Sequence, residues 1–234
     1  MCTIFRGQRG KSCTNPSPGR GGTVDKATLW RHIHAERAAL ATTLAELDDG
    51  DWSHDTLCPG WTVLDVAAHV ISTPQIGWRQ LAEMTMRNLG RSYNTMIFRE
   101  VKRLGAEQTA GSVLSDFATF SSSTHHVPTT TTVEPLIDAL LHHQDIVRPL
   151  GRSRAMDPEA ALVATERVRL LAPLMGTSRL LRSVRMEATD ITWSRGRGPT
   201  IRGPIQELLM IASGRQPDLS LVEGDGRALL DQPG

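Results

Sequence analysis

The strongest constraint on the fold of this chain is a series of four amphipathic stretches between residues 25 and 151, each with the spacing of a helix. Apolar residues three and four positions apart fall on one face of a helix. Such a helix is stabilised mainly by burying that face against another element. Four of them joined by loops therefore predict a helical bundle, with helices at 25–47, 62–71, 107–120 and 135–146.

The first two helices have recognisable starts. Asp25 is a good N-cap for the first helix. The apolar face of this helix has one charged position, Arg37 or Glu36. Its other members are Leu29, Ile33, Leu40, Leu44 and Leu47. The second helix opens on Thr62-Val63-Leu64-Asp65, which resembles a capping box with Asp in place of the usual Glu.

The segments between these helices are less regular. Residues 75–104 hold one or two further helical segments, and their basic residues Arg99, Lys102 and Arg103 are typical of a solvated face. Residues 121–132 form a polar loop that contains His125 and His126. The bundle is expected to span residues 24–151.

The pattern changes after Gly151. Asp157-Pro158-Glu159 predicts a helix start, and this helix is expected to reach about Met175. Three short β-like runs at 183–188, 189–194 and 200–202 follow, and then a last helix at 204–213. The sequence thus predicts a mainly α protein, with a helical bundle followed by a small α/β domain at 152–234.

The segment Gly196-Arg197-Gly198-Pro199 is rich in glycine without being a phosphate-binding loop. It lacks the Gly-Lys-Ser/Thr ending and the helix that such a loop needs. We interpret it as a hairpin turn.

Residues 1–23 combine Gly, Arg, Ser, Thr and Pro without periodicity, which predicts a disordered tail. Patterning begins abruptly at Val24, which suggests that translation starts there, through a GTG codon. The opening residues lack the apolar centre of a secretory signal. We therefore expect a cytoplasmic protein.

Composition excludes several classes of protein. Of 234 residues, 39% are hydrophobic and 22% charged, as in a globular domain. A net charge of +1 argues against a nucleic-acid surface, and no apolar run approaches the roughly 20 residues that span a membrane. Neither nucleic acid nor a membrane is therefore expected as a partner, and the sequence leaves open whether the protein is a monomer or a homodimer.

Cysteine usage limits the kinds of metal site that are available. Cys2, Cys13 and Cys58 form neither a disulfide framework nor a clustered zinc motif. Cys58 lies in a turn just before a helix, where a small packed residue is favoured over a nucleophile. A metal site must then rest on histidine and carboxylate.

Asp138 and His142 are the first candidates for such a site. Four residues apart on a helix, they lie on one face, and a carboxylate and an imidazole placed together can bind a divalent metal. The alternative is an ordinary polar helix face. His69 in the second helix is either a hydrogen-bonded core residue or the third ligand. The loop position of His125 and His126 suits them less well.

Three segments in order form a larger pattern that extends over most of residues 25–230. The first is Cys58-Pro59-Gly60-Trp61-Thr62-Val63-x-Asp65-Val66-Ala67-Ala68-His69-Val70, and the second is His142-His143-Gln144-Asp145-Ile146-Val147-Arg148-Pro149-Leu150-Gly151. The third is Ala188-Thr189-Asp190-x-x-Trp193-x-x-Gly196-x-Gly198, with Arg202-Gly203-Pro204 and Gly214-Arg215. In these segments the chain resembles the mycothiol-dependent maleylpyruvate isomerase family, whose metal-binding domain is a DinB-like four-helix bundle.

The resemblance implies a divalent metal, typically Zn²⁺, held by His69, Asp138 and His142. The founding isomerase has Glu at the carboxylate position, and the shorter Asp remains a good oxygen ligand. Asp145, one turn beyond His142, is either an acceptor for a ligand imidazole or a surface acid. Arg215 is the first candidate for a catalytic cation that meets the substrate or thiol.

Arg202 and Arg185 are weaker candidates for the same role, and an arginine that pins the domain interface is the alternative for Arg215. The resemblance also implies mycothiol as thiol cosubstrate and a small electrophile as substrate. Three protein ligands leave an open position, where a thiol binds as thiolate and attacks, giving isomerisation or thiol transfer. The competing readings are a non-catalytic metal-binding bundle in stress response or regulation, and hydrolysis by metal-bound water.

Overall fold

The structure is a computed structural model, and it describes residues 24–230. The disordered tail predicted for residues 1–23, with Cys2 and Cys13, lies outside the described residues. Most of the described chain is helical, with one small sheet. None of the helices in this part of the chain is long and apolar enough to cross a membrane.

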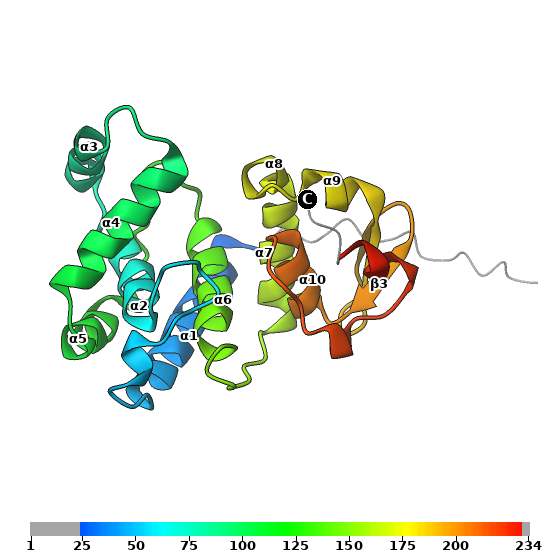
Figure 1. Cartoon of the computed structure of the whole chain (residues 1–234), viewed down its shortest axis with the longest axis horizontal. Coiled ribbons are helices and arrows are strands. Elements are labelled where there is room, and N and C mark those ends of the chain that lie inside the picture. The colour runs from blue at the N-terminus through cyan, green and yellow to red at the C-terminus, as the bar shows by residue number, and fades with distance from the viewer. Residues whose placement is uncertain (1–23, 231–234) are drawn as a thin grey trace, which may run out of the picture.

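Four helices form a closed ring in the first part of the chain (Figure 1). They are α1 (Lys26–Ala45), α2 (Val63–Ser72), α5 (Ala110–Phe120) and α6 (Glu134–Val147). Helix α1 packs against α5 and α6, and α2 packs against the same two from the other side. These are the four helices predicted from the apolar spacing, so the predicted fold class is confirmed.

The predicted helix starts are confirmed at two positions. The Asp25 carboxylate accepts a hydrogen bond from the Thr28 amide at 2.8 Å and caps α1. Thr62 and Asp65 form the capping box of α2, in which the Thr62 amide donates to Asp65 Oδ2 at 2.9 Å. The prediction for α5 was wrong at its start: Glu107 ends the preceding helix, because Thr109 caps a new helix that begins at Ala110.

Two further helices leave the ring between α2 and α5 (Figure 1). Helix α4 (Tyr93–Glu107) packs on α2, whereas α3 (Trp78–Arg87) contacts α4 and buries none of its residues. Short 3₁₀ turns occur at η1 (Asp51–Ser53) and η2 (Thr73–Gln75). The core of the ring is apolar, and its fully buried members include Leu40, Val63, Val66, Val113, Phe117 and Ile146.

The second part of the chain combines four helices with the sheet. The helices are α7 (Pro158–Leu170), α8 (Ala172–Met175), α9 (Ser178–Ser183) and α10 (Ile205–Ala212). The strands are β1 (Arg185–Ala188), β2 (Ser194–Gly196) and β3 (Thr200–Gly203), and the 3₁₀ turns η3 (Leu219–Leu221) and η4 (Asp225–Leu229) follow. The start of α7 and the position of α10 are as predicted, but the helix expected to reach Met175 breaks at Leu171, and α9 was missed.

The sheet corrects two predictions about its strands. Its order is β2-β1-β3, with β1 antiparallel to β2 and parallel to β3. Residues 189–193 are therefore the hairpin turn rather than a strand. The segment 196–199 is not a hairpin turn, because it passes across the start of β1 from one edge of the sheet to the other.

Glycine is required in that crossing. Gly196 and Gly198 have φ angles of 89° and 117°, in a region where side chains are strained. A Cβ atom on Gly198 would lie 2.3 Å from the Ser183 carbonyl oxygen. The two glycines let the crossing segment lie against the backbone of the chain before β1.

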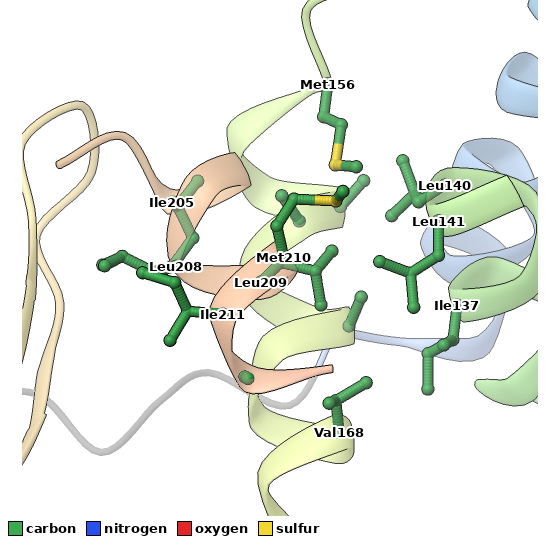
Figure 2. Packing of buried hydrophobic residues seen from close by; sticks show 14 of the residues in the cluster. Ile137, Leu140, Leu141, Met156, Val168, Ile205, Leu208, Leu209, Met210 and Ile211 are labelled. Carbon is green, nitrogen blue, oxygen red and sulfur yellow. The ribbon is translucent and has the colours of Figure 1, made fainter. Parts of the chain in front are cut away.

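One hydrophobic cluster joins the two parts of the molecule. Ile137, Leu140 and Leu141 of α6 face the residues of α7 and α10 (Figure 2). Val168 of α7 and Met210 of α10 belong to the same cluster and are fully buried. The division into domains at residues 151 and 152 stays a prediction, and a continuous core crosses that boundary.

Candidate metal centre

The three predicted metal ligands meet between α2 and α6. Helix α6 presents Asp138 and His142 one turn apart, and α2 presents His69 opposite them. One ligand atom from each side chain lies within 4.8 Å of the other two, and the two imidazole rings are 5.2 Å apart, nearly perpendicular. The structure brings these residues together, and their binding of a metal stays a prediction.

Trp61 closes one side of this group. Its ring lies 5.5 Å from the ring of His69 and 6.1 Å from that of His142. Burial, helped by the nearby charge of His142, lowers the pKa of His69 to about 3. His69 is therefore neutral at pH 7, which is the form in which imidazole binds a metal.

Asp145 orients His142 from the far side of its ring. The Nδ1 atom of His142 lies 2.9 Å from Asp145 Oδ2, which leaves Nε2 as the nitrogen for a ligand. Asp145 is fully buried, so the surface-acid reading of this residue was wrong. Burial opposes protonation of His142, but the hydrogen bonds with Asp145 and Cys58 raise its pKa to about 10, so that binding of a metal at Nε2 would release a proton.

Arg215 supports Asp145 from the second part of the chain. It follows α10, and its Nε and Nη2 atoms donate to the two oxygens of Asp145, each at 2.7 Å. Burial would raise the pKa of Asp145, but these bonds and that from His142 hold it well below its usual range. Arg215 also lines the cavity beside the candidate ligands. Both readings of Arg215, a pin between the two parts and a cation at the site, are compatible with this position.

The other predicted candidates lie elsewhere. Arg202 pairs with Glu223 and Glu187, and Arg185 lies near Glu187, on the sheet. Of the two loop histidines, His126 places Nδ1 near the Val127 carbonyl and Thr130. Neither His125 nor His126 belongs to a cluster of metal-binding side chains within residues 24–230.

Cys58 is the site residue that sequence reasoning missed. Its thiol lies 3.2 Å from Asp145 Oδ2 and 3.7 Å from His142 Nδ1. The loop that carries it is fixed on α6 by a hydrogen bond from the Leu57 amide to the Asp145 carbonyl at 3.1 Å. Cys58, His142 and Asp145 form a second cluster of possible ligands. The only signal for this in the sequence is that Cys58 opens the first segment of the family pattern.

His143 lies about 100° around α6 from His142, an angle that would place it away from the bundle core if the helix buried only one polar face. Instead it is fully buried against α1, with Nδ1 2.7 Å from Glu36 Oε1 and Nε2 2.9 Å from Thr43 Oγ1. Helix α6 therefore buries polar groups on two faces, one toward α2 and one toward α1.

A cavity of about 920 Å³ opens beside the candidate ligands. Its inner wall includes His69, Asp138, His142, Trp61 and Arg215, and its outer wall comes mainly from α3 and α4. Ligand cavities in proteins have volumes of roughly 300–1,000 Å³. The arrangement can therefore hold a sizeable organic molecule against a group of two imidazoles and a carboxylate.

Comparison with known proteins finds one family model and two similar crystal structures. The family model described as the mycothiol maleylpyruvate isomerase N-terminal domain matches residues 33–157. No curated protein sequence matches the chain. The crystal structure of the mycothiol-dependent maleylpyruvate isomerase is similar, with a TM-score of 0.61 at 13% identity over 90% of this chain and 95% of that one.

The structure of a histidine-to-alanine mutant of that isomerase is similar as well. It has a TM-score of 0.53 at 12% identity, over 90% of this chain and 95% of that chain. Likeness at this identity shows a common fold, and the family model covers more than half of the sequence. The chain therefore belongs to the mycothiol maleylpyruvate isomerase family.

Proposed function

We propose that this protein is a metal-dependent, thiol-activating enzyme of the mycothiol-dependent isomerase or S-transferase type. His69, Asp138 and His142 hold a divalent metal, typically Zn²⁺, and mycothiol is the thiol cosubstrate. The observation that carries this proposal is the convergence of these three side chains within 4.8 Å at the wall of a cavity.

The donor set fits such an ion. Two imidazoles and one carboxylate are the ligands of several catalytic zinc sites, which keep one position open. Donation of Nδ1–H from His142 to Asp145 is the contact that commonly orients an imidazole ligand. When bound, a divalent ion lowers the pKa of a coordinated thiol, so that the thiol is available as thiolate at neutral pH.

The protein side chains supply position and exclusion of water. Asp145 fixes the ring of His142, and Arg215 keeps Asp145 ionised through two hydrogen bonds. Trp61 covers both imidazoles on one side. In the proposed reaction the thiolate sulfur adds to one carbon of an activated carbon–carbon double bond, and the π pair moves onto the conjugated acceptor group of the substrate. Rotation about the resulting single bond, return of the pair and expulsion of the thiolate give the isomer, whereas protonation of the adduct retains the thiol and gives transfer.

Binding of a thiol to the cobalt-substituted protein tests this proposal. Cobalt replaces zinc in such sites and reports its ligands through visible absorption. Mycothiol should produce a sulfur-to-cobalt absorption band, and the protein should then turn over at least one electrophile from a panel. Absence of both the band and turnover would contradict the proposal and favour a metal-binding protein without thiol chemistry.

A further inference from the structure

The outer wall of the cavity carries apolar side chains that the protein itself leaves partly uncovered. Four half-buried residues line the cavity there: Ile76, Leu81, Met84 and Met96. None of the four belongs to either hydrophobic cluster of the described chain, and helix α3, which carries Leu81 and Met84, buries none of its residues. Because removal of apolar surface from water is favourable, this wall favours a ligand with an apolar portion.

The arginines of the cavity wall are already paired. Three of them line the cavity, and each donates to a buried carboxylate. At the inner wall, Arg215 donates to both oxygens of Asp145, each at 2.7 Å. At the outer wall, Arg87 and Arg103 share Glu100, at 2.6 Å and 3.2 Å. The described part of the chain therefore presents no unpaired arginine or lysine to a carboxylate in this cavity.

The other charged side chains of the outer and inner walls include three acids. Glu83, Asp116 and Asp138 line the cavity as well. Of these, only Glu83 forms an ion pair within the described residues, with the exposed Arg79 at 3.0 Å. A polycarboxylate would lose its water beside these acids and gain no free cation in return, and such unpaired charge is one way in which a site rejects a ligand.

The centre of the proposed metal site is also balanced in charge. Without metal, Asp145 pairs with both Arg215 and His142, and the second positive charge there faces Asp138, one turn along α6. With a divalent ion and a bound thiolate, the ion is offset by Asp138 and the thiolate. In both states the inner end of the cavity lacks the excess positive charge that a dianion requires.

We propose that the electrophile taken by this cavity is an uncharged, largely apolar molecule, such as an α,β-unsaturated ester, rather than a polycarboxylate. Its apolar portion lies on Ile76, Leu81, Met84 and Met96, and its double bond faces the proposed metal site. The proposal rests on the proposed function, because it names the substrate class of the thiol addition. The apolar wall and the paired arginines, however, belong to the protein alone.

Two fluorescent probes with the same ring system test the preference of the cavity. N-phenylnaphthylamine is uncharged, and anilinonaphthalene sulfonate is the same molecule with an added sulfonate group. Dissociation constants are measured for the purified protein with mycothiol and again after chelation of metal. In both states the uncharged probe should bind about tenfold more tightly or better, because the sulfonate finds no free cation. Equal or tighter binding of the sulfonate would overturn the proposal.

Two methionines of α3 locate the bound probe. Met84 lines the cavity, whereas Met86 is 72% exposed and lies outside the lining. Met84→Gln should weaken binding of the uncharged probe by about threefold or more, since an apolar contact is lost. Met86→Gln makes the same change on the solvent side of the helix and should leave the affinity unaltered. Equal effects of the two variants would overturn the assignment of this wall.

Turnover of a matched pair of electrophiles tests the substrate class. Diethyl maleate and maleate share one double bond, and only maleate carries carboxylates. Each rate with metal-loaded protein and mycothiol is divided by the rate without protein, because the ester is intrinsically more reactive. The ester should be accelerated about tenfold more than maleate, and a larger acceleration of maleate would overturn the proposal. Turnover of neither compound, with the probe preference intact, would instead overturn the proposed function.

Discussion

At the scale of single residues, the site depends on Asp145 more than on any other side chain outside the proposed ligand set of His69, Asp138 and His142. It contacts His142, Arg215 and Cys58 through its carboxylate and Leu57 through its backbone. A group with so many partners controls the orientation of its neighbours. Its loss should affect metal binding and the packing of the two parts of the chain together.

Asp145→Asn should weaken metal binding by about 10- to 100-fold, because it removes the charge and one of the two acceptor oxygens behind a ligand imidazole, and loss of such support has that effect in other metal sites. It should also destabilise the fold by about 3 kcal/mol or more, since Arg215 would remain buried without a counter-ion. Metal competition assays and chemical unfolding measure the two effects. Asp116→Asn, another carboxylate of the cavity wall, should change neither, and unaltered metal affinity in Asp145→Asn would refute the role.

At the scale of elements, the outer wall of the cavity is held by one buried acid. Glu100 of α4 accepts hydrogen bonds from Arg87 at 2.6 Å, Asn88 at 2.6 Å and Arg103 at 3.2 Å. Helix α3 buries no residue of its own. Its position against α4 therefore depends largely on this cluster.

Glu100→Gln should loosen α3 without unfolding the bundle. Bonds to a charged group contribute about 1.5–3 kcal/mol, so amide hydrogen exchange in α3 should accelerate by roughly tenfold or more. Glu83→Gln, which removes an exposed pair with Arg79, should have little effect. Equal exchange rates in α3 for both variants would show that the cluster does not hold this helix.

The same cluster predicts an acid-dependent change. The hydrogen bond from Arg87, more than offsetting burial, lowers the pKa of Glu100 to about 2. A carboxyl group with a lowered pKa stabilises the fold above its unfolded pKa, about 4.3, and this stabilisation is lost as the pH falls toward 2. Protection of α3 amides should therefore fall between these values in wild type and stay constant there in Glu100→Gln.

At the scale of the whole molecule, the two parts of the chain share a core and several ion pairs in which the carboxylate is buried. Ile137, Leu140 and Leu141 of α6 are buried by α7 and α10 (Figure 2). Arg215 meets Asp145, and Arg148 meets Glu207 of α10 at 2.7 Å. The site is thus built from α2, α6 and the residue that follows α10 by a short turn.

The described chain should consequently unfold as one unit. Calorimetry is expected to show a single transition with equal calorimetric and van't Hoff enthalpies, because separation of the parts would expose the apolar face of α6. A fragment ending at residue 151 should be unstable or self-associate in sedimentation experiments. Two independent transitions would contradict this view and support separate domains.

The helices of the bundle could be predicted from the sequence, whereas the contacts within the site could not. Helices α1, α2 and α6 could be predicted because caps such as Asp25 and Thr62 and the spacing of apolar residues act within a few positions of the chain. Cys58 acquires its place in the site from residues 84 or more positions away, His142 and Asp145. Burial of His143 likewise depends on Glu36 across the bundle. Strand order was missed because short strands carry little information about their partners.

Metal content of the purified protein is the most direct test of the proposed site. The wild type and a variant with His125→Ala and His126→Ala should each contain about one divalent ion per chain, because the loop histidines lie outside both clusters of possible ligands. The triple variant His69→Ala, Asp138→Ala and His142→Ala should contain none, while retaining its helical circular dichroism. Stoichiometric metal in the triple variant would contradict the proposed ligand set.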